Sequence, residues 1–133
     1  MSDVTANASA DVTAVVDDYL AALSEGDAGA RARLVSRAWD EDGRFVDPLL
    51  DVRGHEAIGD IANAVREQFP EHTFRRTSGI DLHHDRVRFT WALVGPDGAV
   101  ALGGVDVGEV GEDGRLRQIV GFFGDVPEGA EAA

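Results

Sequence analysis

Apolar residues in the first part of the chain recur with the spacing of an α-helix. From Val12 through Tyr19 to Leu23 they fall at positions i, i+3, i+4, i+7, i+8 and i+11, which places them on one stripe of a helix. Ser9 or Asp11 is suited to begin this helix, and Gly26 to end it. The pattern therefore predicts a first amphipathic helix that packs its stripe into the core.

Two more helical patterns follow. The first covers about residues 28–39, with Arg31, Arg33 and Arg37 on one face and four inward-facing residues on the other: Leu34, Val35, Ala38 and Trp39. The second opens at Gly54 and ends at Pro70, since proline disfavours helix in the residue before it.

The segment between the second and third helices is predicted to be a small hairpin. Residues 40–43, Asp-Glu-Asp-Gly, have the composition of a turn. Residues 44–47 form a short strand that Pro48 stops, because proline has no N–H to donate to a ladder. Residues 51–53 pair with that strand.

From His72 onward the period of the pattern changes to two, which is typical of strands. Four strands are predicted, over residues 73–82, 86–94, 99–110 and 116–123, and their short connections favour antiparallel pairing. This order predicts an α+β fold in which three helices pack on one face of a curved, mostly antiparallel sheet. We expect one domain over residues 10–125, a flexible N-terminus (1–9) and a flexible acidic tail (126–133).

Composition narrows the function classes. The 133 residues include 25 acidic and 12 basic side chains, a formal net charge of −13, which disfavours nucleic acid and anionic membrane surfaces as partners. The absence of cysteine and lysine excludes disulfides, thiolate chemistry and Schiff bases. With no signal peptide and no apolar run long enough for a membrane helix, we expect a cytoplasmic protein with no membrane partner.

Three stretches of the chain resemble one known superfamily in order and spacing. They are Thr13–Leu23 with Gly26-Asp27, then Phe45-Val46-Asp47-Pro48 with Arg53-Gly54, and the final strands with Val105-Asp106-Val107, Gly114-Arg115-Leu116 and Val120–Phe123. Over residues 11–124 the chain resembles the nuclear transport factor 2-like superfamily, which includes SnoaL-like polyketide cyclases and ketosteroid isomerases. The resemblance implies a cone with an internal apolar pocket, and subunits that pair through their sheets as a homodimer. We expect the pocket to be lined by Trp39, Phe45, Ile61, Val65, Trp91 and Phe122.

The resemblance also implies catalytic residues. Tyr19, Asp47 and Asp106 match the positions at which ketosteroid isomerases keep their chemistry. Removing a proton next to a carbonyl needs a base, and it needs hydrogen-bond donors for the oxyanion that forms. In that enzyme class an Asp is the base, and a Tyr and a protonated Asp are the donors. The leading hypothesis is therefore an isomerase or cyclase with Asp47 as base and Tyr19 and Asp106 as donors, using no cofactor and no metal.

Each of these residues also has a purely structural interpretation. Tyr19 lies on the apolar stripe and could be a core aromatic residue. Asp47, before Pro48, could serve only the turn. Asp106 could face solvent, although by period two it shares a face with Leu102, Gly104 and Gly108, and these glycines would leave space for a ligand. Around Ile61 the chain has small residues where some isomerases hold a second tyrosine, so the network behind Tyr19 is expected to differ.

Two alternatives to an enzyme stay open. A non-catalytic domain that binds an apolar small molecule needs only the pocket, whereas an interaction module predicts a filled cone and a broad exposed apolar sheet face. An enzyme requires the three candidate residues to converge.

The roles of His55, His83 and His84 stay open, and no local spacing predicts a metal site. Arg75, Arg76, Arg86 and Arg88 are expected to pair with acidic residues, or one of them could hold a carboxylated ligand.

Overall fold

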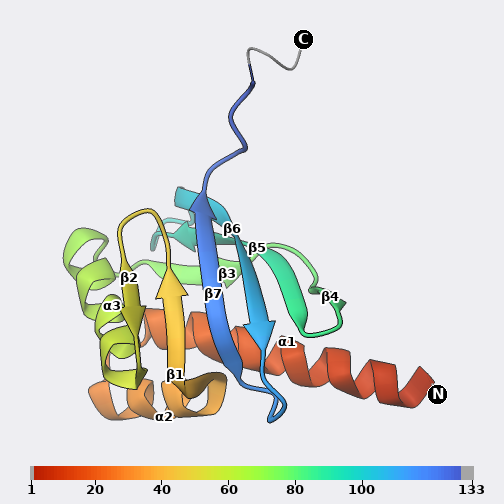
Figure 1. Ribbon diagram of the computed structural model, residues 1–133. Helices are drawn as coiled ribbons and strands as arrows, with labels where there is room; N and C mark the ends of the chain where they lie inside the picture. The colour runs from red at the N-terminus through yellow and green to blue at the C-terminus, as the bar shows by residue number, and fades with distance from the viewer. Residues whose placement is uncertain (1, 130–133) are drawn as a thin grey trace.

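A computed structural model describes residues 2–129, and side chains from residue 11 onward. Within these residues, three helices and seven strands follow one another (Figure 1). They are α1 (Ser2–Ser24), α2 (Ala28–Ala38), β1 (Trp39–Val46), β2 (Asp51–Arg53), α3 (His55–Gln68), β3 (Thr73–Arg76), β4 (Asp81–His83), β5 (Arg86–Val94), β6 (Val100–Val110) and β7 (Leu116–Phe123). This confirms the α+β fold with three helices. The domain limits stay a prediction, and residues 130–133 of the expected tail lie outside the described residues.

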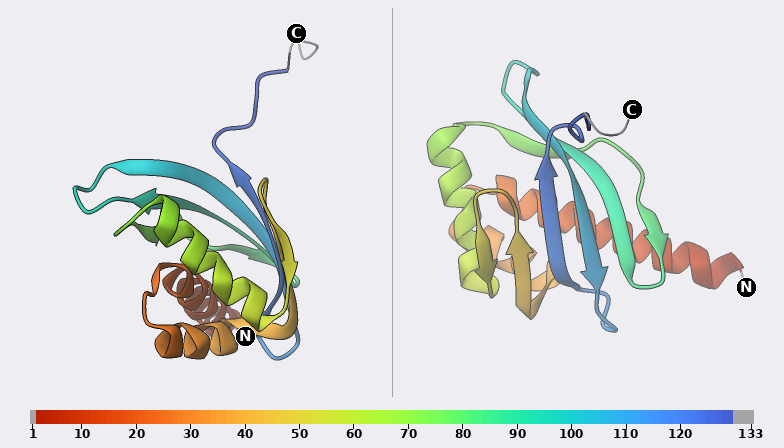
Figure 2. Two further views of the ribbon diagram at one scale, coloured as in Figure 1. Left: turned by 90° about the vertical axis from the view of Figure 1, so that its left-hand side faces the viewer. Right: turned by 45° about the horizontal axis from the view of Figure 1, so that its top comes forward.

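The strands form one open, curved sheet. Their order is β2-β1-β7-β6-β5-β3, and β4 also pairs with β5. The pairings that join β3, β4, β5, β6 and β7 are antiparallel, as the meander predicted. The pairing of β1 with β7 is parallel, and it brings the last strand of the chain against the first. Figure 2 shows the sheet curving over the three helices.

Two stretches fold differently from their predicted form. Residues 40–43 belong to β1 and do not form a turn. The register between β1 and β7 shifts between Trp39 and Arg44, and at this irregularity Gly43 lies directly under the indole of Trp39. A bulge favours glycine as a turn does, so the local composition was ambiguous. The predicted strand 73–82 is divided into β3 and β4, which pair with successive parts of β5.

The helices also depart from prediction at their ends. Helix α1 begins at Ser2, ahead of Ser9 and Asp11, and α2 ends at Ala38, so Trp39 is the first residue of β1. Arg31, expected on an outer face, is buried. Its guanidinium donates to the carbonyls of Glu25 and Gly26 at 3.0 and 3.4 Å. It thereby supplies donors for two carbonyls in the short segment between α1 and α2.

Polar contacts hold helix α1 against β3, in addition to the packing of its apolar stripe. The Ser24 hydroxyl donates to the Leu20 carbonyl at 3.0 Å and accepts the backbone N–H of Phe74 at 2.9 Å. Arg76 pairs with Asp17 at 2.8 Å. These contacts join the two ends of β3 to α1, so the helix lies in a fixed position over the concave face.

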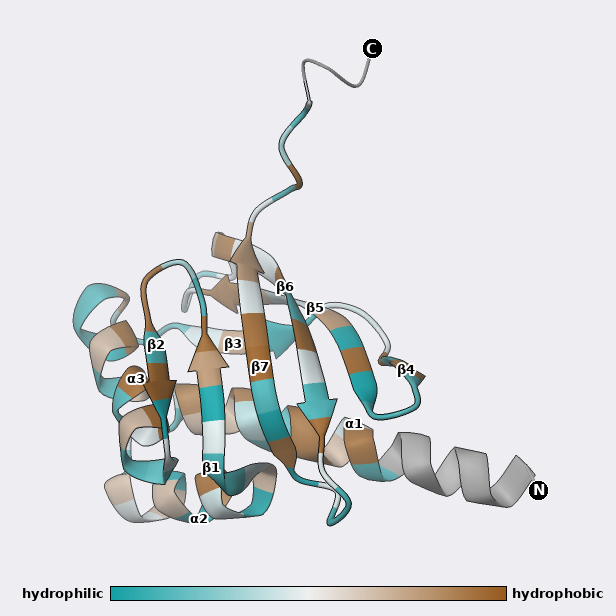
Figure 3. Ribbon diagram, in the orientation of Figure 1, coloured by the Kyte–Doolittle hydropathy of each residue, from teal (hydrophilic) through white to brown (hydrophobic). Residues whose placement is uncertain are grey.

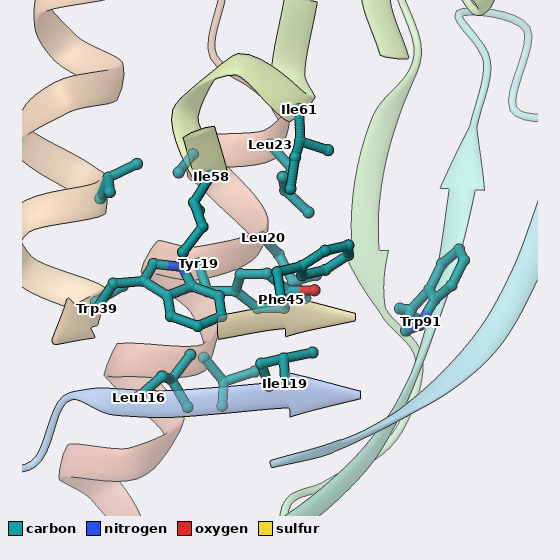
Figure 4. Packing of buried hydrophobic residues seen from close by; sticks show 14 of the residues in the cluster. Tyr19, Leu20, Leu23, Trp39, Phe45, Ile58, Ile61, Trp91, Leu116 and Ile119 are labelled. Carbon is teal, nitrogen blue, oxygen red and sulfur yellow. The ribbon is translucent and has the colours of Figure 1, made fainter. Parts of the chain in front are cut away.

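The core gathers between α1, α3 and the β1–β7 pair. Figure 4 shows Trp39, Ile58, Leu116 and Ile119 packed around Tyr19 and Phe45, with Trp91 further along the sheet. The rings of Tyr19 and Trp39 meet edge to face, with centroids 5.6 Å apart, a favoured aromatic geometry.

Within residues 2–129, no helix combines the length and the apolar character needed to cross a membrane.

The parallel β1–β7 pair depends on residues such as Ile119, which is fully buried and lies opposite Phe45. We expect Ile119→Ala to lower the free energy of unfolding by about 2–5 kcal/mol, because it leaves a cavity that the surrounding core cannot close. Urea denaturation measures this loss. Val126→Ala, at an apolar residue that is 90% exposed, is the matched control. A loss of similar size in both variants would contradict this account of the core.

Candidate functional site

An apolar cavity of about 180 Å³ lies between the concave face of the sheet and helices α1 and α3. Its walls are mostly aliphatic and aromatic, and three acidic or phenolic side chains reach it: Tyr19, Asp47 and Asp106. The structure therefore brings together the three residues that the sequence singled out, from α1, the end of β1 and the middle of β6. Its aromatic wall consists of Tyr19, Phe45, Phe69, Phe74, Trp91 and Phe123.

Asp106 is 2% exposed, and both of its carboxyl oxygens accept a hydrogen bond. The Tyr19 hydroxyl donates to Oδ2 at 2.8 Å, and the Trp91 indole Nε1–H donates to Oδ1 at 3.0 Å. Burial raises the pKa of Asp106 to about 7, although the two hydrogen bonds oppose the rise. Asp106 therefore changes its protonation state near neutral pH.

The Tyr19 hydroxyl is engaged by Asp106. Burial raises the pKa of Tyr19 well above its ordinary value, and the nearby carboxyl of Asp106 adds to the rise. The phenol is therefore neutral and gives its one O–H to Asp106. The hypothesis made both Tyr19 and Asp106 donors to the oxyanion of a ligand, whereas in the structure the Tyr19 hydroxyl donates to Asp106.

Asp47 is held by the turn that follows β1. Its Oδ1 accepts the backbone N–H groups of Leu49 and Leu50, both at 2.8 Å, and its own N–H donates to the Leu50 carbonyl at 2.9 Å. The turn interpretation of Asp47 is thus correct, and the same residue also lines the cavity. No described residue donates to Oδ2, so this oxygen is the one available for a ligand.

Space beside the two carboxyl groups comes from a different glycine than the sequence suggested. A Cβ on Gly104 would lie 2.5 Å from the Trp91 indole, and one on Gly108 would lie 2.8 Å from Ile119, so packing fills the space beside both. A Cβ on Gly121 would lie 2.8 Å from Asp106 Oδ1 and 3.6 Å from the Asp47 Cβ. Gly121 is the residue that keeps the region between the two carboxyl groups open.

Four of the six predicted lining residues border the cavity: Phe45, Ile61, Val65 and Trp91. The other two predictions are wrong. Phe122 is 56% exposed on the opposite face of β7, and its neighbour Phe123 lines the cavity instead. Adjacent strand residues face opposite ways, and Phe123 shares a face with Gly121. Trp39 is fully buried at the β1 bulge, beyond the cavity.

Sequence reasoning expected Trp91 in the wall but missed its hydrogen bond to Asp106. A signal was present, since a buried indole N–H usually finds an acceptor. The predicted antiparallel pairing of β5 and β6 also brings the two residues close, because Trp91 pairs with Gly104, two residues before Asp106. The exact register was needed to see this.

No histidine or arginine lines the cavity among the described residues. His55 lies at the start of α3, where its Nε2 is 2.8 Å from the Trp39 carbonyl, and His83 and His84 contact each other on the surface. Arg76, Arg86 and Arg88 pair with Asp17, Asp85 and Asp81, as predicted. In residues 11–129, no three acidic or histidine side chains are placed to hold a metal ion.

A second, open groove of about 610 Å³ lies at the other end of β1 and β7 and is lined by charged residues such as Asp40, Arg44 and Arg117. Arg44 is already paired with Asp51 at 2.7 Å. The groove holds none of the three candidate residues, so the apolar cavity is the candidate site.

Comparison with known proteins agrees with this geometry. Residues 16–119 match the model of the SnoaL-like domain. A protein from Agrobacterium tumefaciens, provisionally described as an isomerase of the SnoaL-like family, is 36% identical. The matched region covers 87% of this chain and 99% of that protein's chain, with a TM-score of 0.80. Among proteins with curated functional descriptions, none matches.

Two more distant structures share the fold alone. One, from Jannaschia sp., is provisionally described as a SnoaL-like polyketide cyclase; it is 19% identical, with a TM-score of 0.61 over 84% of this chain and 85% of its own. The other is a protein of unknown function with a cystatin-like fold from Methylobium petroleophilum. It is 16% identical, with a TM-score of 0.71 over 94% of this chain and 83% of its own. The fold and the cavity define a member of the nuclear transport factor 2-like superfamily. Within it, the chain belongs to the SnoaL-like family.

The raised pKa of Asp106 makes stability depend on pH. The folded protein holds a proton up to about pH 7 that the unfolded chain releases near its ordinary pKa of 3.8. This contribution to the free energy of unfolding is complete below about pH 4 and is lost as pH rises through about 7. The quantity to follow is the difference in the free energy of unfolding between the wild type and Asp106→Asn, measured by urea denaturation. The wild type should lose on the order of a few kcal/mol relative to the variant between about pH 4 and 8.

The matched control for this prediction is Asp125→Asn, at an exposed residue outside the cavity. Its difference from the wild type should stay constant over the same range. A constant difference for Asp106→Asn as well would show that the buried carboxyl does not titrate near neutral pH.

Proposed function

We propose that this protein catalyses proton transfer next to a carbonyl group of an apolar cyclic or polyketide-like substrate bound in the cavity. The observation that carries the proposal is the meeting of Asp47 and the Tyr19–Asp106–Trp91 network in one otherwise apolar cavity. A carboxylate base and a neutral acid facing the same ligand are what enolisation needs.

Asp47 serves as the base. Its Oδ1 is fixed by two backbone N–H groups, which hold the carboxylate in place and leave Oδ2 to take the proton from the carbon next to the carbonyl. The same oxygen returns the proton at the far end of the enolate. Because the backbone orients the carboxylate, little reorganisation is needed during the reaction.

Asp106, when protonated, serves as the donor to the oxygen on which negative charge develops. Tyr19 and Trp91 act through Asp106: they hold its carboxyl in place, and the carboxylic O–H is left to meet the substrate. Since the pKa of Asp106 is about 7, the donor form is present below that pH and is lost above it.

The simplest test uses cyclohex-3-enone, whose conversion to the conjugated cyclohex-2-enone is followed by ultraviolet absorbance. Asp47→Asn should lower kcat/KM by roughly 10²- to 10⁴-fold, because the amide cannot accept the proton. Asp125→Asn, at an exposed residue that does not line the cavity, is the control. Turnover that survives in Asp47→Asn would remove Asp47 as the base. Absence of turnover in the wild type would favour the non-catalytic alternative, a domain that only binds a small molecule.

We also propose that two copies pair through the outer face of the sheet. On that face β6 and β7 place Val105 opposite Phe122 and Val107 opposite Val120, and we call these four residues the outer strip. Phe122 is 56% and Val107 38% exposed, and the upper half of β7 is apolar in Figure 3. An exposed apolar strip on a sheet is suited to a self-complementary contact between two copies.

Light scattering after gel filtration tests this pairing. The wild type should have the mass of a dimer, and Phe122→Ser should shift it toward the monomer, because the change removes the largest exposed apolar side chain of the strip. Val126→Ser, at an apolar residue outside the sheet that is 90% exposed, should leave the dimer intact. A monomeric wild type, or a fully dimeric Phe122→Ser variant, would contradict the proposal.

A further inference from the structure

The size of the cavity limits what can occupy it. At about 180 Å³ it is only slightly larger than an engineered protein cavity of about 150 Å³ that binds benzene. It is smaller than the roughly 300–1,000 Å³ of pockets that enclose drug-sized ligands. The enclosed part of a ligand is therefore comparable to a single ring with a small substituent.

The inner walls of the cavity are parts of the core. Trp91, Leu93 and Ile61 are all buried, and the indole of Trp91 is fixed between Gly104 and the Asp106 carboxyl. Forcing extra atoms into a packed wall costs about 1–3 kcal/mol. The exposed lining residues, Leu49, Ala64 and Gln68, mark the mouth between the β1–β2 turn and α3, so a longer ligand would leave the cavity there.

Charge limits the occupant further. The lining includes two carboxyl groups, Asp47 and Asp106, and no arginine or histidine among the described residues. The chain carries a formal net charge of −13, which repels anions at longer range as well. An anionic ligand would bring its charge against two acidic groups in an apolar cavity, with no cation to compensate it.

We propose that the cavity selects an uncharged carbonyl compound whose enclosed part is one ring in size, that it disfavours carboxylated ligands, and that a second ring adds nothing to affinity. This inference rests on the proposed function in two respects: the ligand occupies the same cavity, and its carbonyl oxygen meets Asp106. It narrows the apolar cyclic or polyketide-like substrates of the proposed function to a much smaller class.

Nuclear magnetic resonance of the tryptophan indole N–H signals tests this selection without any need for turnover. The Trp91 signal reports on the cavity, and the Trp39 signal, from the core beyond it, is an internal reference; Trp91→Phe assigns the two. The probes are acetophenone, its two-ring analogue 2-acetonaphthone, and benzoate, which has the same number of non-hydrogen atoms as acetophenone and carries a negative charge.

Acetophenone should shift the Trp91 signal, and 2-acetonaphthone should bind no more tightly. Hydrophobic burial of a second ring would otherwise tighten binding by about tenfold or more. Benzoate should bind at least about tenfold more weakly than acetophenone. In Leu102→Ala, which enlarges the cavity at a lining residue of β6, the two-ring ketone should gain affinity relative to acetophenone.

The outcomes separate this inference from the proposed function. Affinity that rises from acetophenone to 2-acetonaphthone in the wild type, or benzoate that binds as well as acetophenone, would overturn the selection and leave proton transfer standing. Binding of acetophenone in the expected order, together with no turnover of cyclohex-3-enone, would support the selection and remove the catalysis. If none of the three probes shifts the Trp91 signal, the selection fails, and proton transfer is judged by the turnover of cyclohex-3-enone alone.

Discussion

The arrangement of residues around the cavity depends on the buried carboxyl group of Asp106 and on the hydrogen bonds that it accepts. An acidic group this deeply buried is costly unless hydrogen bonds satisfy it, and here each oxygen has one donor, from Tyr19 on α1 and from Trp91 on β5. The two bonds join the first helix to the middle of the sheet. They also fix two of the aromatic residues that form the wall, so the network that satisfies the acid also shapes the cavity.

Small residues decide where these large groups lie. Gly104 lets the Trp91 indole approach β6 closely, and Gly121 leaves open the region between Asp106 and Asp47. A side chain at Gly104 would displace the donor of Asp106, whereas one at Gly121 would fill the site itself. Glycine, which usually weakens a strand, therefore has two different tasks on neighbouring strands. One keeps the network in place, and the other keeps the cavity open.

The sequence predicted what depends on local periodicity. The stripe from Val12 to Leu23, the third helix and the hairpins of the meander all follow from spacing and turn residues, and Tyr19, Asp47 and Asp106 were named from a resemblance. What it missed depends on contacts between distant segments. The parallel pairing of β1 with β7 and the bulge at Gly43 arise only when the first and the last strand meet. Likewise, two adjacent phenylalanines on β7 are equivalent in pattern, and only the sheet decides that Phe123 faces inward.

The order of the hydrogen bonds changes the chemistry that the three residues can perform. A tyrosine and an acid placed side by side would both stabilise an oxyanion, but Tyr19 has a single O–H, and Asp106 accepts it. The ligand therefore meets one acid whose charge changes near neutral pH. Below that pH Asp106 carries a proton that it can donate to a ligand oxygen, as the proposed function requires. Above it Asp106 has no proton to donate, and a carbonyl oxygen loses this partner. In the proposed function, the protonation of one buried residue thus decides whether the cavity can stabilise a carbonyl oxygen.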